Sequence, residues 1–254
     1  MAQRRTYAIP PLVEALCEIH FAPGQEWDWT VPGLLYAQLQ KDYPRKEQAE
    51  QVEVQWGDNP SQVHRQTSRR LRFFNEHKTA LVQVGKDLLV FNQLHPYPGW
   101  DLFRSMLVSA LERYKAVAAP SGVAACALRY LNRLSIPQES ATLEDYLLAV
   151  PSIPKNLPQT LVGWSLSLDI PHEVRKGVMH LEAGSAPSQG TGRVAFVLDL
   201  RFQAISPKEL GLDDGLLEWV DGAHEIIEET FEASITDQAR SLFEELIHDQ
   251  LASR

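Results

Sequence analysis

The opening of the chain constrains its fold more than any other segment. Pro10 and Pro11 lead into a run from Glu14 to Phe21 in which two kinds of residue alternate. Because successive side chains of a strand point to opposite faces, this run predicts a β-strand with two different surfaces. One surface carries Glu14, Glu18 and His20, and the other carries Ala15, Cys17, Ile19 and Phe21. Carboxylates within a sheet need neutralising partners, which the rest of the sequence should supply.

A later segment offers cations at the same spacing. Between Ala125 and Ile136 the residues again alternate, and Arg129 and Arg133 share one face with a leucine between them. Glu14 and Glu18 are also separated by a leucine on their shared face, so the two strands carry opposite charges in one pattern. Opposite charges that face each other on adjacent strands stabilise a sheet. We therefore expect these two strands to be neighbours.

The remaining periodicity predicts a mixture of hairpins and helices. Further strands are expected at Val52–Trp56, Arg70–Glu76, Thr79–Val84, Leu88–Gln93, Leu161–Ile170, Gly177–Ala183 and Arg193–Ile205. Helices are expected at Val31–Tyr43, Trp100–Ala118, Leu143–Val150, from Asp213 or Asp214 to about Ser234, and from a cap at Thr236 to Ile247. Strands in hairpins with few crossovers predict an α+β fold with mainly antiparallel sheets. We expect two related halves, each covered by a long helix, although their sequences are too dissimilar to identify a repeat.

The proline-rich stretch Pro151–Pro158 is the best candidate boundary between these halves. It predicts an N-terminal α+β half at 1–150 and a C-terminal α+β half at 151–254 that ends in long acidic helices. One continuous domain is the alternative, and the sequence leaves open whether the halves share one sheet.

Composition and charge narrow the class of protein. The 254 residues are 44% hydrophobic and 22% charged, as in ordinary globular proteins. No apolar run approaches the roughly 20 residues that span a bilayer, and the first residues lack a signal-peptide core, so we expect a cytoplasmic protein without a membrane partner. From Ile205 to Arg254 the chain has 13 acids and three bases. Nucleic acid is therefore not an expected partner of this part. The acids form either the solvated face of helices or a docking surface.

The candidate binding residues are those that share the charged strand faces. Asp199 and Arg201 alternate on a later strand and join the first two pairs. The set is Glu14, Glu18, Arg129, Arg133, Asp199 and Arg201. It has three interpretations: a salt-bridged sheet face, a concave site for a polar ligand or partner, or a site where a carboxylate performs acid–base chemistry.

Aromatic residues near predicted loops form a second candidate surface. These are Trp27, Trp29 and Trp100. Exposed aromatics are enriched at interface hot spots, but loop aromatics also tuck under sheet edges, and both interpretations stay open here.

The sequence predicts no catalytic residue, cofactor or metal site. Cys17 and Cys126 lie in apolar strand patterns and are expected to be buried thiols; a redox pair would require them to be close and accessible. His224 shares a helix face with Asp221 and Glu228, which indicates either a hydrogen-bonded surface histidine or a weak divalent site. The glycine-rich tract Gly184–Gly192 lacks the Gly-Lys-Ser/Thr ending of a phosphate loop and is expected to be a hairpin connection.

Three short motifs resemble those of a known family. They are Pro10-Pro-Leu-Val-Glu-Ala-Leu-Cys-Glu-Ile-His-Phe21, Arg129-Tyr-Leu-Asn-Arg-Leu134, and His224-Glu225 with Phe231-Glu232 and Ile235-Thr236. They resemble signatures of a sporadically distributed bacterial family of uncharacterised proteins of about this length. The resemblance spans nearly the whole chain and implies a single family-length unit, but it supplies no catalytic residues. Sporadic distribution is typical of mobile, defence or toxin–antitoxin genes.

These observations give two hypotheses about function. The first is a non-enzymatic cytoplasmic binding or regulatory protein, an accessory, defence-associated or antitoxin-like partner of a neighbouring gene product. Its partner would be a protein, and the sequence leaves homo-oligomerisation open. The alternative is a ligand-binding or hydrolytic enzyme that uses the charged sheet face.

Overall fold

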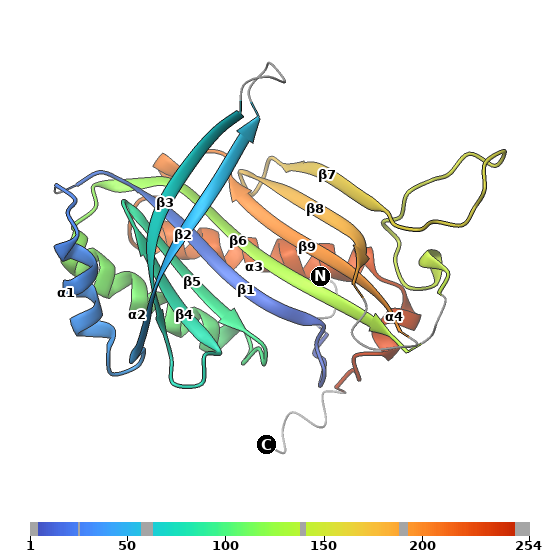
Figure 1. The fold of residues 1–254 in the computed structure, drawn as a ribbon, viewed down its shortest axis with the longest axis horizontal. Helices are drawn as coiled ribbons and strands as arrows, with labels where there is room; N and C mark the ends of the chain where they lie inside the picture. The colour runs from blue at the N-terminus through green and yellow to red at the C-terminus, as the bar shows by residue number, and fades with distance from the viewer. Residues whose placement is uncertain (1–4, 25, 57–62, 138–140, 188–192, 247–254) are drawn as a thin grey trace. The chain divides into compact units, whose positions relative to one another are not determined.

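The fold is built on a single sheet, as a computed structural model shows (Figure 1). The structure describes residues 5–24, 26–56, 63–137, 141–187 and 193–246. Nine strands lie in the order β2-β3-β4-β5-β1-β6-β9-β8-β7. The predicted α+β class with antiparallel pairing is confirmed. The open question of one sheet or two is answered in favour of one.

The elements follow most of the predicted sites. The strands are β1 (Leu12–Ala22), β2 (Arg45–Trp56), β3 (Val63–Phe74), β4 (Ala80–Gly85), β5 (Leu88–Leu94), β6 (Gly122–Ile136), β7 (Ser165–His172), β8 (Gly177–Ala186) and β9 (Val194–Ala204). The α-helices are α1 (Thr30–Leu39), α2 (Trp100–Ala118), α3 (Asp214–Ser234) and α4 (Asp237–Ser241). Short 3-10 turns lie at Leu143–Asp145 and Pro207–Glu209.

The chain divides into two compact units. Unit 1 comprises Met1–Ala15, Leu128–Ser206 and Asp214–Arg254, and unit 2 comprises Leu16–Ala127 and Pro207–Asp213. Strands β1 and β6 therefore contribute residues to both units. The division at 150 and 151 stays a prediction about which segments fold independently.

In unit 1, α3 packs against β9. The ring of Trp219 on α3 stacks on Phe202 of β9 with 5.7 Å between ring centroids. Leu216, Val220 and Ile227 are also buried on this face of α3, at the spacing of an amphipathic helix. Gly177 at the start of β8 is required here, because a Cβ atom at this position would lie 2.2 Å from the Phe202 ring.

In unit 2, α1 and α2 bury aromatic and aliphatic side chains of the neighbouring strands. Phe103 of α2 meets Phe91 of β5 at 5.2 Å between centroids, and Tyr114 stacks on Phe21 of β1 at 4.6 Å. Every residue of β4 is buried, which explains why its sequence is apolar apart from Gln83. Helix α2 has the predicted bounds, since its buried residues recur at helical spacing.

The predicted neighbourhood of the first strand and the arginine strand is confirmed, because β1 and β6 are adjacent in the sheet. Within unit 1, the backbone N–H of Arg133 donates to the Pro11 carbonyl at 2.8 Å. Within unit 2, the N–H of Ser121 donates to the Ala22 carbonyl at 3.3 Å. The buried and half-buried residues of β1 alternate as expected from Ala15 onward.

Three predicted helices differ from the structure. The helix expected at Val31–Tyr43 is α1, which ends at Leu39. Instead of a helix at Leu143–Val150 there is a single 3-10 turn, because Leu147 leaves it to form a β-bridge with Ile235. The helix capped by Thr236 ends at Ser241. Phe243 and Glu244 accept hydrogen bonds from Ile9 and Ala8 through their carbonyls, which an extension of α4 would prevent. The cap is confirmed, since the Thr236 side chain accepts the Ala239 N–H at 3.2 Å.

Other predictions fall partly outside the described residues. The hairpin connection at Gly184–Gly192 includes residues 188–192, and the end of the predicted last helix, Ile247, also lies outside. Within the described residues, no helix is both long and apolar enough to cross a membrane.

Candidate functional site

Unit 1 carries a set of charged side chains on one face of its strands. The register fixes this arrangement: His180 of β8 lies opposite both Asp169 of β7 and Arg201 of β9, while Glu182 lies opposite Asp199. Directly opposed residues of antiparallel strands point to the same side. Arg129 of β6 bonds Asp199, and the Glu14 carboxylate of β1 acts electrostatically on Arg129. We call Glu14, Arg129, Asp169, His180, Glu182, Asp199 and Arg201 the charged face.

The centre of the charged face is a two-point ion pair. The Nε of Arg129 donates to one oxygen of Asp199 at 2.8 Å, and its Nη2 donates to the other oxygen. The Asp199 side chain is only 10% exposed, whereas that of Arg129 is 42% exposed. The hydrogen bonds to Asp199 raise the pKa of Arg129, and the nearby carboxylates of Glu14 and Glu182 act in the same direction. Arg129 is therefore a fixed cation whose geometry Asp199 determines.

The rim of the charged face is more open than its centre. Glu182 is exposed and lies directly opposite the carboxylate of Asp199. The side chain of Asp169 is 69% exposed, and its Oδ1 lies 2.6 Å from Nδ1 of His180. Arg129 interacts with both Asp199 and Glu182 and so offsets the repulsion between these carboxylates on adjacent strands. The exposed carboxylates of Glu182 and Asp169 can in addition contact a cationic or hydrogen-bonding group from outside.

The structure separates the predicted binding residues into three groups. Glu14, Arg129, Asp199 and Arg201 belong to the charged face. Glu18 lies in unit 2, where its carboxylate is 2.7 Å from Nε2 of His20. The Arg133 guanidinium donates to the carbonyl of Pro187 within unit 1. Sequence spacing could not distinguish a carboxylate partner from this backbone carbonyl.

The predicted aromatic surface is only partly exposed. Trp29, immediately before α1, is 54% exposed, whereas Trp27 is half-buried. Trp100 is half-buried and stacks on Phe103 with 5.7 Å between centroids. These positions fit both interpretations of the tryptophans, so an interface here stays a prediction.

His224 differs from its predicted environment. It is 3% exposed, so it is not a surface residue, and its Nδ1 lies 2.9 Å from the Tyr130 hydroxyl. Its Nε2 lies 3.3 Å from Glu228. The prediction of a hydrogen-bonded histidine is confirmed, and the surface location is wrong because α3 turns this residue toward β6. Among the described residues, no group of three or more His, Cys, Asp or Glu is arranged around a common metal position.

The two cysteines are buried neighbours in unit 2. Both are free thiols, and Cys126 interacts with Cys17 through a side-chain hydrogen bond. Burial, followed by this hydrogen bond, raises the pKa of the Cys126 thiol. The prediction of buried thiols is confirmed. A protonated thiol is also a poor nucleophile.

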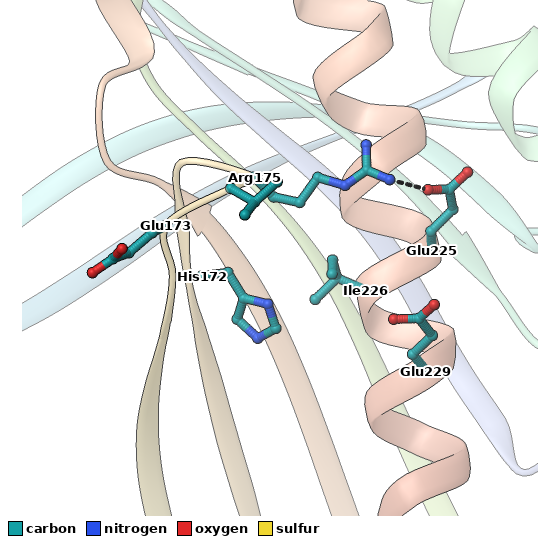
Figure 2. A pocket seen from close by; sticks show the side chains of 7 residues that line it. His172, Glu173, Arg175, Glu225, Ile226 and Glu229 are labelled. Atoms are coloured by element: carbon teal, nitrogen blue, oxygen red, sulfur yellow. Dashed lines mark hydrogen bonds and ion pairs between the residues drawn. The ribbon is translucent and has the colours of Figure 1, made fainter. Parts of the chain in front are cut away.

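Sequence reasoning missed a pocket in unit 1. It has a volume of about 290 Å³ and lies between the β7–β8 turn and α3. Figure 2 shows the ring of His172 pointing toward Ile226, with the Arg175–Glu225 ion pair on one side and Glu229 on the other. Arg175 Nη2 donates to Glu225 at 2.6 Å. About fifty residues separate these partners in the sequence, and no periodic signal connects them.

A polar chain in unit 2 was also missed. Arg72 Nε donates to Gln83 Oε1 at 3.1 Å, and Gln83 Nε2 donates to Asn92 Oδ1 at 2.8 Å. Gln83 and Asn92 are buried. The available signal was the recurrence of polar residues inside strands that are otherwise apolar. Because these side chains satisfy one another's hydrogen bonds, we interpret them as contributing to the stability of unit 2 rather than to a binding site.

No protein-family model matches the chain, and no curated protein matches it.

Proposed function

We propose that this chain is a non-enzymatic binding protein that holds a protein partner on the charged face of unit 1. The observation that carries the proposal is the Arg129–Asp199 pair, a fixed two-point contact at the centre of an ionic surface. Exposed Glu182 and Asp169 surround this pair with charges that a partner can meet. Complementary charges of this kind determine partner choice and association rate.

The contacts within the charged face support binding over catalysis. Asp199, the most buried carboxylate of the charged face, already accepts hydrogen bonds from Arg129 at both of its oxygens. A general base must be able to reach a proton of the substrate. The pocket described above is lined by other residues, His172 and Arg175 among them.

Several finer features belong to the same proposal. We take the chain to be cytoplasmic, a relative of the sporadic bacterial family that its motifs resemble, and an accessory or antitoxin-like partner of a neighbouring gene product. We also take residues 1–150 and 151–254 to be related halves, because α2 packs against β5 in the first and α3 packs against β9 in the second.

Co-purification from the native operon tests this proposal. A tagged chain should retain a neighbouring gene product, and Arg201→Glu should release it because carboxylates of the partner that face Arg201 would then meet a like charge. Lys208→Glu is the matched control, since it makes the same charge change at an exposed position of unit 2. The proposal fails if both variants retain the partner equally. Turnover of a small molecule that Arg201→Glu abolishes, with no protein retained, would favour the alternative of an enzyme.

A further inference from the structure

Strand β7 is the last strand at one end of the sheet (Figure 1). Among the residues that the structure describes it pairs with β8 alone, from Ser165 opposite Gly184 to His172 opposite Gly177. The Trp164 carbonyl accepts the Ser185 N–H at 3.0 Å. Along an antiparallel strand, every second residue directs its backbone N–H and C=O groups toward the neighbouring strand. Because Trp164 bonds β8, the even-numbered residues of β7 direct these groups toward β8. The N–H and C=O groups of Ser165, Ser167 and Asp169 consequently point away from the sheet.

The apolar side of β7 is incompletely covered. Leu168 and Ile170 lie opposite Leu181 and Met179 of β8, which are buried in the core of unit 1. Leu168 is nevertheless 40% exposed and Ile170 38% exposed. The apolar side of the sheet thus extends to β7, where its side chains are partly exposed to solvent. His172 lies on the same side and lines the pocket that Ile226 of α3 closes (Figure 2).

Carboxylates flank this edge on both sides. On the polar side are Asp169 and, one strand inward, exposed Glu182. On the apolar side the pocket carries Glu173, Glu225 and Glu229, and Arg175 is paired with Glu225. The segment Ser165–His172 itself has one acid and no lysine or arginine. Two copies paired along β7 would therefore bring acidic edges together, which argues against a second copy as the occupant.

We propose that the β7 edge receives an extended segment of another protein, one in which apolar residues alternate with lysine or arginine. The segment would add a strand to the sheet through the outward backbone groups of Ser165, Ser167 and Asp169. Its apolar side chains would cover Leu168 and Ile170, and its cations would lie beside Asp169 and Glu182. Pro171 has no N–H and ends the ladder, so the edge accepts a short segment. This surface extends the proposed function but does not depend on the centre of the charged face.

Binding of defined peptides to the full chain tests the inference. The probe is a fluorescent six-residue peptide of alternating lysine and valine, and the comparison peptides replace lysine by glutamate or methylate the edge-facing amide nitrogens. We expect the lysine peptide to bind about tenfold more tightly than the glutamate peptide. N-methylation should abolish binding, because it removes the donors that pair with β7.

Protein variants locate the site of peptide binding. Asp169→Lys should lower the affinity for the lysine peptide about tenfold. Glu26→Lys makes the same charge change at an exposed position of unit 2 and should not lower this affinity. Arg201→Glu should leave peptide binding intact, so failure of the Arg129-centred function and failure of this inference are distinguishable. Equal binding of the lysine and glutamate peptides, or no binding of either, overturns the inference. A stable dimer that Leu168→Asp dissociates would assign the edge to a second copy and also overturn it.

Discussion

Arg129 and Asp199, on neighbouring strands of unit 1, form a two-point ion pair in which the aspartate is almost fully buried. The two partners are unequal, because Arg129 keeps part of its guanidinium in contact with solvent. Loss of the buried partner leaves a half-buried cation, and loss of the arginine leaves a buried anion. A buried charge without its partner is strongly unfavourable. The pair is therefore both a feature of the fold and the centre of the proposed binding surface.

Replacing Asp199 with alanine should lower the free energy of unfolding by about 2 kcal/mol, since the remaining Arg129 loses two charge-assisted hydrogen bonds. Urea unfolding followed by circular dichroism measures this change. Asp169→Ala is the control, because its carboxylate is 69% exposed and pairs with a single histidine. Its cost should stay below about 1 kcal/mol. Equal costs for the two variants would show that burial does not distinguish these ion pairs.

Gly177→Ala should destabilise unit 1 by about 1–3 kcal/mol, because the new methyl group overlaps the buried Phe202 ring. The ring cannot move freely, since Trp219 stacks on it and His172 meets its edge. Thermal unfolding of the variant measures the effect. Gly163→Ala, where a Cβ atom meets nothing within 4 Å, should leave the melting temperature almost unchanged. A melting temperature for Gly177→Ala that equals that of Gly163→Ala would contradict this packing.

Tyr43 should make the chain less stable at alkaline pH. Burial, reinforced by the negative charge of Asp42, raises the pKa of Tyr43 to about 12. The unfolded chain ionises this tyrosine near pH 10, so the stabilisation is complete below pH 10 and is lost as pH rises toward 12. Between pH 10 and 12 the stability of the wild type should fall by about 1.4 kcal/mol per pH unit relative to Tyr43→Phe. Denaturant unfolding of both proteins across this range measures the difference, and parallel pH profiles would contradict the prediction.

Cys17 and Cys126 should resist thiol reagents until the chain unfolds. Both thiols are buried, and the raised pKa of Cys126 keeps it protonated at neutral pH. An aromatic disulfide reagent should label neither cysteine in the native protein and both in guanidinium chloride. The rate of labelling under native conditions then reports opening of unit 2. Rapid native labelling of either thiol would instead support the redox interpretation.

Elements with local periodicity could be predicted from the sequence. The alternation and opposite charges of β1 and β6 correctly predicted that these strands are neighbours, although the hydrogen bonds of Arg129 go to Asp199 of β9. Helix α2 was predicted with its observed bounds because its buried residues recur at helical spacing. The helix predicted at Leu143–Val150 was wrong because the conformation of this segment depends on a β-bridge between Leu147 and the distant Ile235, which no local pattern encodes.

The candidate site was predictable only where the charges follow strand alternation. Glu14, Arg129, Asp199 and Arg201 were identified in this way, whereas His180 and Glu182 joined them through a register that only the structure supplies. The pocket beside Arg175 and Glu225 could not be predicted, because it forms where a hairpin turn meets α3 within unit 1. Side chains that meet through tertiary packing leave no common period in the sequence.

The affinity of the retained partner for charge-reversal variants tests the central claim most directly. The partner recovered from the native operon would be titrated against the wild type, Arg201→Glu and the control Lys208→Glu, with circular dichroism confirming that all three are folded. A binding protein that uses the charged face should lose about tenfold or more in affinity in Arg201→Glu and keep its affinity in Lys208→Glu. Equal affinities for the three folded proteins would contradict the claim that this face holds the partner.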